Sequence, residues 1–362
     1  MKIMNTQKTI KNSIISMICH IVILILSFVN RRIFVIFLDI EYLGYQSLFS
    51  NIFSIISVAE LGIGHIISFH LYIEIAKDNK EEIGKLMNIY KCLYYIVAVT
   101  MLILGVCCCF FLSSFIKETS TDWLYLYIIY FLQLLSVVAG YAMSYKRTFL
   151  IVTQQEYRCI QIEMFVTIVV QLLQVVMLAI FRNYILYLCM QLSIALISNF
   201  IISIKVDKEY PYLKNKYVIK KEDMVKRNMF SDIKSYLIHQ ISYAIYSGTD
   251  NIMISAFCGI RDVALYGNYL ILQKGFVQLF SYRMLNPVQA ALGNIIYGDT
   301  SKEKQWEQFN MLDVFSFFLA SYVGNGFLVF LQPAIQLWMG KDYLLSDKFV
   351  WIFSVTIYFV VV

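Results

Sequence analysis

The sequence predicts an all-α, polytopic membrane protein. Hydrophobic residues make up 59% of the 362 residues and charged residues only 15%, against about 45–50% and about 25% in soluble globular chains. Most apolar stretches are about as long as a helix needs to cross a hydrocarbon core of about 30 Å. A porin-like barrel would instead alternate apolar and polar residues over segments of about ten. The chain contains only 3 prolines, so long helices are free to form.

Ten apolar stretches are candidate membrane spans. A basic segment precedes the first, but no small-residue cleavage site follows it, which favours an uncleaved span over a signal peptide. The last stretch ends at the final residue without a polar tail, so we expect that the chain is truncated and that C-terminal helices are missing. The approximate limits are Ser13–Leu38, Gly44–Ile75, Ile89–Phe115, Trp123–Met143, Cys159–Phe181, Tyr184–Ile204, Ile233–Phe257, Gly267–Ile296, Phe309–Leu331 and Phe349–Val362.

Basic residues are distributed unequally over the two sides of the membrane. With a cytoplasmic N-terminus, 21 of the 30 Lys and Arg residues fall on the inner side and 5 on the outer side, which is the positive-inside pattern. The excess of basic residues that gives the net charge of +6 is therefore explained by the orientation of the chain in the membrane. It does not indicate a nucleic-acid partner. The longest polar segment, residues 205–230, is expected to be a basic cytoplasmic linker, either solvated or a docking site. It divides a six-helix N-terminal lobe, residues 1–204, from a C-terminal lobe of about four helices, residues 231–362.

The sequence offers no enzyme active site. Eight cysteines lie in or beside apolar runs without CxxC spacing, which favours packed or lipid-facing thiols over disulfides or a metal site. No nucleophile–base cluster or metal-ligand spacing occurs, so we expect no catalytic residue, no metal and no cofactor. His20 and His239, one in each half, either relay protons or are packed as neutral side chains.

The two halves contain a weak internal repeat. An offset of 219 places Arg31 on Asp250, and beyond the first outer loop an offset of 223 places Glu60 on Arg283. The four-residue difference predicts a longer second loop at residues 259–262. Because six helices intervene, both halves would enter the membrane in the same orientation, as a parallel repeat about an axis along the membrane normal.

Four basic residues lie inside predicted spans, namely Arg31, Arg32, Lys274 and Arg283. A charge at the bilayer centre costs about 2.5–3.5 kcal/mol on insertion scales, so such residues usually face a wet cavity or a partner. We therefore predict that these four face a wet cavity. The alternatives are that Arg31 or Arg32 reaches outward to the membrane surface, and that Arg283 only pairs with Glu60.

Two acidic residues, Glu60 and Asp250, are candidates for gating or coupling. Glu60 and Arg283 lie near the middle of the membrane in equivalent positions of the two halves, so they can approach across the twofold axis and form a gate. Such a contact must break in every transport cycle, so its net stabilisation has to be modest. Asp250 lies about two turns from the outer end of its helix.

Several short motifs lie in or beside the paired spans of the two halves. They are Glu41-Tyr42-Leu43-Gly44, Leu48-Phe49-Ser50-Asn51-Ile52, Ala59-Glu60-Leu61-Gly62-Ile63-Gly64, Thr249-Asp250-Asn251-Ile252-Met253-Ile254-Ser255 and Leu265-Tyr266-Gly267-Asn268-Tyr269. Together they resemble bacterial oligosaccharide flippases of the polysaccharide transporter family. The superfamily also contains the multidrug-and-toxin extrusion transporters and the lipid II flippase. The resemblance implies two helical lobes around a central cavity.

The resemblance also implies the substrate and its route. An undecaprenyl-pyrophosphate-linked oligosaccharide would cross the bacterial cytoplasmic (inner) membrane by alternating access, for capsule, O-antigen-like or exopolysaccharide assembly, with polysaccharide polymerase or export machinery as a possible partner. Such a substrate needs an aqueous cavity with fixed cations, and the arginine fork fits phosphate oxygens. The cations for this role are Arg31, Arg32, Arg283 and Lys274. Cavity arginines on the first and eighth helices are expected of the family, and Arg31, Arg32 and Arg283 occupy those helices.

Two other functions compete with this interpretation. A cation-coupled multidrug antiporter of the same fold would need acidic groups in its cavity, whereas the first span offers arginines and Asp250 alone is a weak cation site. A membrane polymerase or acyltransferase would need a catalytic acid–base set or a long outer loop, and the sequence shows neither.

Overall fold

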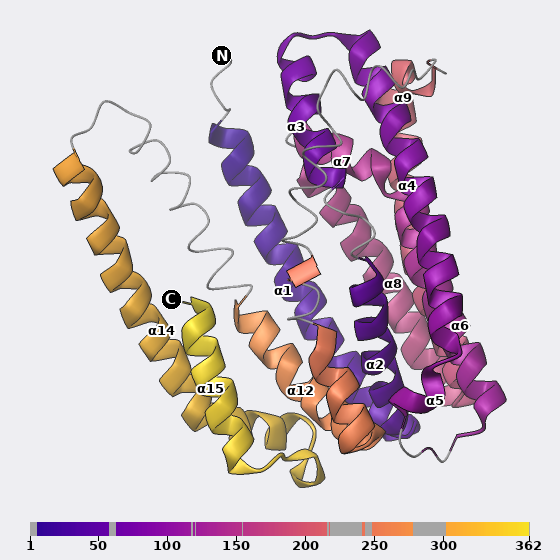
Figure 1. Cartoon of the computed structure of the whole chain (residues 1–362), viewed down its shortest axis with the longest axis vertical. Coiled ribbons are helices and arrows are strands. Elements are labelled where there is room, and N and C mark those ends of the chain that lie inside the picture. Colours follow the sequence, from indigo (N-terminus) through magenta and orange to yellow (C-terminus); the bar gives the residue numbers. More distant parts are fainter. Residues whose placement is uncertain are drawn as a thin grey trace. The chain divides into compact units, whose positions relative to one another are not determined.

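The computed structural model describes residues 6–57, 63–116, 119, 121–153, 155–215, 217, 241–242, 248–277 and 302–361. Every regular element in these ranges is helical (Figure 1), which confirms the all-α prediction. The chain forms two compact units, Met1–Val263 and Ala264–Val362. Most of the predicted linker lies outside the described residues, so the division at residues 205–230 stays a prediction.

The first unit contains nine numbered helices that precede the linker, and a further helix at residues 248–257. Its major contacts join α1 to α8, α8 to α9, and α6 to both α4 and α9. The bounds are α1 (Thr6–Phe37), α2 (Glu41–Ile56), α3 (Ile63–Ala76), α4 (Lys80–Cys109), α5 (Leu112–Phe115), α6 (Trp123–Met143), α7 (Tyr145–Val152), α8 (Glu156–Phe181), α9 (Tyr184–Glu209) and the 3-10 helix η2 (Pro211–Lys214).

The second unit is built on the helices α12 (Ile260–Val277), α14 (Lys302–Trp338) and α15 (Asp347–Val361) and on the 3-10 helix η4 (Lys341–Tyr343). Helix α12 begins at the end of the first unit. Helices α14 and α15 lie side by side (Figure 1). The Tyr269 hydroxyl is 2.7 Å from Gln332 Oε1 and accepts a hydrogen bond from the Leu345 amide at 2.9 Å, which ties α12 and α14 to the turn before α15.

Among the described residues, five helices are long and apolar enough to cross a membrane. They are α4, α6, α8, α9 and α14, and each was predicted as a span. Helix α6 has the predicted bounds, and α8 and α9 begin within three residues of them. The predicted span Gly44–Ile75 is occupied by two helices, α2 and α3, on either side of residues 58–62, which lie outside the described residues.

The outer loop predicted at residues 259–262, in the second half of the internal repeat, differs from the prediction. Residues 260–262 were expected in a long loop, but α12 already begins at Ile260, so the turn consists of Cys258 and Gly259. Gly259 has a φ of +122°, a conformation that glycine adopts without steric cost. Asp262 lies in the first turn of α12, where a negative charge is favoured by the helix dipole. A left-handed glycine and a helix-starting aspartate therefore make the turn short.

Candidate functional site

A buried polar face on α1 connects this helix to α8 and α9. Asn30 Nδ2 donates to Gln174 Oε1 at 3.1 Å, and Gln174 Nε2 donates to the carbonyl oxygen of Tyr187 at 3.1 Å. Asn30 and Gln174 are 5% and 1% exposed. Four residues further along the same face, Phe34 packs edge-on against Tyr184 and Tyr187. Amide hydrogen bonds between membrane helices contribute about 0.6–2 kcal/mol each, so this face fixes the rotation of α1 about its axis.

Arg31 lies at the border of this packed face. Successive residues of a helix are about 100° apart, so Arg31 points about 100° away from Asn30. Its side chain is partly exposed and lies close enough to Tyr187 for an electrostatic interaction. The guanidinium is therefore held beside the ring of a neighbouring helix, where it is largely shielded from solvent.

Arg32 lies on the opposite, exposed face of α1. It shares a helical stripe with Ile25, Val29 and Ile36, which are 50–63% exposed, and it is itself partly exposed. The two adjacent arginines thus have different surroundings, because the packing of Asn30 sets where each of them points. A charged residue on an open face of a membrane helix requires water or a partner.

The other predicted site residues are spread over the chain. Asp250 is exposed in helix 248–257 of the first unit, and Lys274 is exposed in α12 of the second unit. Glu60 and Arg283 lie outside the described residues. Of the predicted set, the described residues therefore bring together only Arg31 and Arg32, as neighbours on α1. Among the described residues, no group of three or more His, Cys, Asp or Glu side chains could hold a metal ion.

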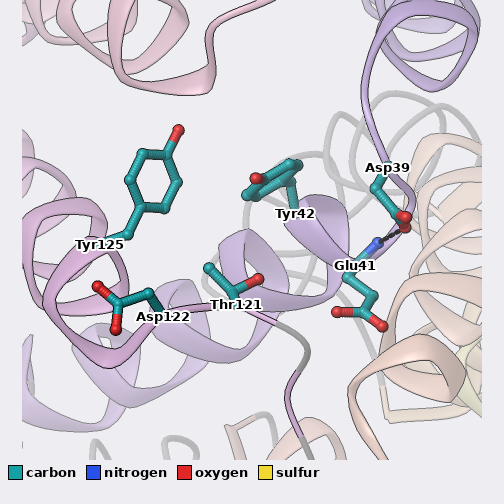
Figure 2. Close-up of a pocket in the computed structure, with 6 residues that line it drawn as sticks. All are labelled: Asp39, Glu41, Tyr42, Thr121, Asp122 and Tyr125. Atoms are coloured by element: carbon teal, nitrogen blue, oxygen red, sulfur yellow. Dashed lines mark hydrogen bonds between the residues drawn. The ribbon is translucent and has the colours of Figure 1, made fainter.

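A pocket of about 430 Å³ opens where α1 ends and α6 begins. This end of α1 faces the side that the charge distribution predicts to be outside, and we call it the outer face. Figure 2 shows carboxylates and tyrosine rings from the two segments around the same opening. The lining residues are Asp39, Glu41, Tyr42, Thr121, Asp122 and Tyr125.

The pocket is negatively charged and partly aromatic. Asp39 Oδ1 accepts a hydrogen bond from the Glu41 amide at 3.0 Å, drawn as a dashed line in Figure 2. Asp122 is the N-cap residue of α6, but its side chain makes no capping hydrogen bond. Three carboxylates in one opening attract cations, accept hydrogen bonds from hydroxyl groups, and repel phosphate. The pocket therefore complements the chemistry of the arginines on α1.

A row of tyrosines leads from the pocket to Arg31. The ring centroids of Tyr125 and Tyr42 are 6.1 Å apart, those of Tyr42 and Tyr184 are 4.8 Å apart, and those of Tyr184 and Tyr187 are 6.0 Å apart. Tyr187 in turn lies beside Arg31. The row joins α6, α2 and α9 and forms a continuous aromatic wall between the outer pocket and the charged part of α1.

The opposite, inner end of the first unit is held by ion pairs of α7, a helix that lies in a predicted loop. Lys146 Nζ donates to Asp207 Oδ1 at 2.6 Å and to Ser203 Oγ at 2.8 Å. Arg147 pairs with Glu163 of α8. These contacts fasten α7 to the ends of α8 and α9. Glu163 of α8 therefore has a structural role.

The first residues of the predicted linker are also packed. Helix α9 extends to Glu209, and Asn88 of α4 donates to the carbonyl oxygen of Asn215 at 3.0 Å. A side chain on Gly84 would clash with the Tyr217 ring, so the absence of a β-carbon allows this ring to lie on α4. Burial raises the pKa of Tyr212 to about 12.

Comparison with known proteins gives one family and one fold. The family described as polysaccharide biosynthesis protein matches residues 9–284. A solved structure of an inward-facing multidrug resistance transporter of the MATE family, in the MOP superfamily, matches with a TM-score of 0.61 and 15% sequence identity. The match covers 94% of this chain and 78% of that one. No curated protein matches the chain. At this identity the structural similarity shows the fold alone.

Proposed function

Because the chain belongs to the polysaccharide biosynthesis protein family, we propose that it is a flippase for lipid-linked oligosaccharides. It moves undecaprenyl-pyrophosphate-linked repeat units from the inner to the outer leaflet of the bacterial cytoplasmic membrane, with its N-terminus in the cytoplasm. The family and the MATE-like fold are those of membrane transporters. The proposal adds the substrate, its direction and the residues that bind it.

The observation that carries this proposal is the pair of arginines inside α1. Both side chains are partly exposed, and the packing of Asn30 and Phe34 directs them to two different sides of the helix. A pyrophosphate presents several oxygens in different directions, and each guanidinium can bind two of them in a bidentate manner. Arg283 and Lys274 are proposed as further cations for the same group. A cavity for cationic drugs would have little use for these charges.

The pocket at the outer face supports the proposed direction of transport. Its carboxylates repel a pyrophosphate but accept hydrogen bonds from sugar hydroxyls. The headgroup of the substrate would thus meet positive charge inside the membrane and negative charge where it leaves. Polymerase or export machinery would receive the product at this face.

The test is removal of the gene that encodes the chain from its own organism. We expect surface polysaccharide to be lost and undecaprenyl-pyrophosphate-linked oligosaccharide to accumulate, and we expect the intact gene to restore export. Unchanged polysaccharide together with increased sensitivity to cationic drugs would instead identify a multidrug antiporter.

The same strain tests the binding residues. The triple variant Arg31→Ala/Arg32→Ala/Arg283→Ala should be expressed but should not restore export. The triple Arg→Lys variant should restore it only partly, because lysine keeps the charge and loses the bidentate geometry. The control is Lys348→Ala, which removes an exposed charge in α15 and should restore export fully. Full export by the alanine variant would remove these arginines from the binding site.

A further inference from the structure

Helix α2 lies along helix 248–257 within the first unit, and the two run in opposite directions. Near the outer face, Gly44 contacts Ile260. Further along α2, Asn251 Nδ2 donates to the carbonyl oxygen of Ser47 at 3.4 Å. Near the other end of α2, Gly248 contacts Ile55. As the residue numbers increase along α2, those of the contacting residues in the partner segment decrease. The contact therefore follows nearly the whole length of α2. We call it the outer seam.

The seam is closed most tightly at Gly44. A β-carbon added at this position would clash with the backbone carbonyl oxygen of Ile260. Backbone atoms cannot rotate away as the end of a side chain can, so any other residue must push the two segments apart. Gly44 is in an ordinary helical conformation inside α2. Glycine is therefore required here for close approach, not for backbone freedom.

The seam contains two buried polar residues, and one of them has an oxygen without a hydrogen-bond partner. Asn251 is 2% exposed and Ser255 is 0% exposed. Ser255 Oγ donates to the carbonyl oxygen of Phe115 in α5 at 2.6 Å, whereas Asn251 Oδ1 has no hydrogen-bond partner. A buried polar atom without a partner destabilises the closed arrangement, and it becomes hydrated when the helices separate. The closed and open arrangements are thereby brought closer in free energy.

We propose that the outer seam is the outer gate of this transporter, shown here closed, and that Gly44 sets how tightly it closes. The gate differs from the Glu60–Arg283 contact predicted from the sequence, because it uses glycine packing and hydrogen bonds from side chains to backbone carbonyl groups. Opening separates α2 from helix 248–257 and exposes Asn251 and Ser255 to water. The inference requires a transporter but no particular substrate.

The first test measures access from outside. In a cysteine-free background, a reporter Ile55→Cys lies at the inner end of the seam. Adding Gly44→Ala should raise its rate of labelling by an impermeant thiol reagent in intact cells by about tenfold, because overpacking favours the open arrangement. The matched control is Gly140→Ala in α6, where a β-carbon meets nothing within 4 Å. Equal labelling rates with Gly44→Ala and Gly140→Ala would overturn the gate.

The second test measures the seam directly, as the fraction of the expressed chains that become cross-linked. Cysteines at Ser47 and Asn251 should be joined by a short bifunctional thiol reagent, and the yield should fall several-fold when Gly44→Ala is added. Cysteines at Asn30 and Gln174, which report the static contact of α1 and α8, should be joined equally with and without Gly44→Ala. If the Ser47–Asn251 pair is never joined, or is joined equally in both backgrounds, the seam is not a gate.

Neither measurement uses transport, so the two proposals fail in different ways. If the seam opens but the chain exports no polysaccharide, the gate proposal stands and the flippase proposal fails. If the chain exports polysaccharide but the seam does not open, the flippase proposal stands and the gate proposal fails.

Discussion

Lys146 of α7 donates a hydrogen bond of 2.6 Å to Asp207 of α9, and only 10% and 23% of the two side chains are exposed. Removing one partner leaves a largely buried charge, which is costly in a membrane protein as in a soluble one. We expect Asp207→Asn to destabilise the purified protein by about 1–3 kcal/mol, measured as a lower unfolding temperature in detergent.

The matched control for this pair joins α8 to α9 at the same end of the first unit. Arg158 and Glu209 are 2.6 Å apart, but their side chains are 37% and 40% exposed. Because exposed pairs contribute about 0–1 kcal/mol, Glu209→Gln should change the unfolding temperature much less. The double variant Lys146→Met/Asp207→Leu should recover part of the loss, since it leaves no charge unpaired. Equal effects of Asp207→Asn and Glu209→Gln would show that burial of the pair is unimportant.

The charge distribution makes a prediction about topology. Asn215 follows α9 on the predicted cytoplasmic side, and Thr121 precedes α6 on the outer face. Single cysteines at these positions, in a cysteine-free background, should label from opposite sides with an impermeant reagent. The background matters because Cys92, Cys107, Cys189 and Cys258 are exposed. Labelling of both positions from outside intact cells would contradict the predicted orientation.

The outer pocket should create a negative local potential. A cysteine at Thr121 should react faster with a cationic than with an anionic methanethiosulfonate reagent of similar size, because three carboxylates line the opening. At low ionic strength, Asp122→Asn should reduce this preference several-fold, and salt should weaken it in the unaltered pocket. Glu81→Gln, at the far end of the 30-residue α4, should leave the preference unchanged. An equal preference in all three proteins would show that these carboxylates are neutral or turned away.

The internal repeat predicts that Glu60 and Arg283 face one another in one state of the transport cycle. Either single reversal, Glu60→Arg or Arg283→Glu, should stop polysaccharide export, because like charges would then oppose each other. The double reversal should recover part of the export if the pair acts as a gate. No recovery, with both single variants inactive and all three proteins expressed, would indicate that Arg283 serves the substrate rather than Glu60.

Hydropathy predicted the helices that are bounded by polar residues. Helix α6 lies between Asp122 and Ser144, and its predicted bounds agree with the structure. Helix α7 was missed because its eight residues are too few for a span. Its basic residues also find their acidic partners far along the chain, 61 residues away for Lys146 and Asp207. A search for long apolar stretches cannot detect a short helix that is held in place by ion pairs to distant parts of the chain.

The site was predicted only in part, for the same reason. Arg31 and Arg32 could be predicted from the sequence, because inserting a charge into the membrane is unfavourable. Their different surroundings could not be predicted, because these depend on the packing of Asn30 against Gln174. The outer pocket was not predicted, because residues 39–42 and 121–125 become neighbours only in the folded unit. A usable signal existed, since both segments flank spans at the same predicted face and carry carboxylates beside tyrosines.

The hydrogen bond between Asn30 and Gln174 has a consequence for how the protein is made. The two residues are separated by 144 positions, and ribosomes add about 5–20 residues per second. Helix α1 therefore enters the membrane with an amide and two arginines on the order of ten seconds before α8 is synthesised. During that interval, water, lipid headgroups or the insertion machinery must satisfy these groups. The nascent chain is thus most dependent on assistance at its first helix, long before any cavity exists.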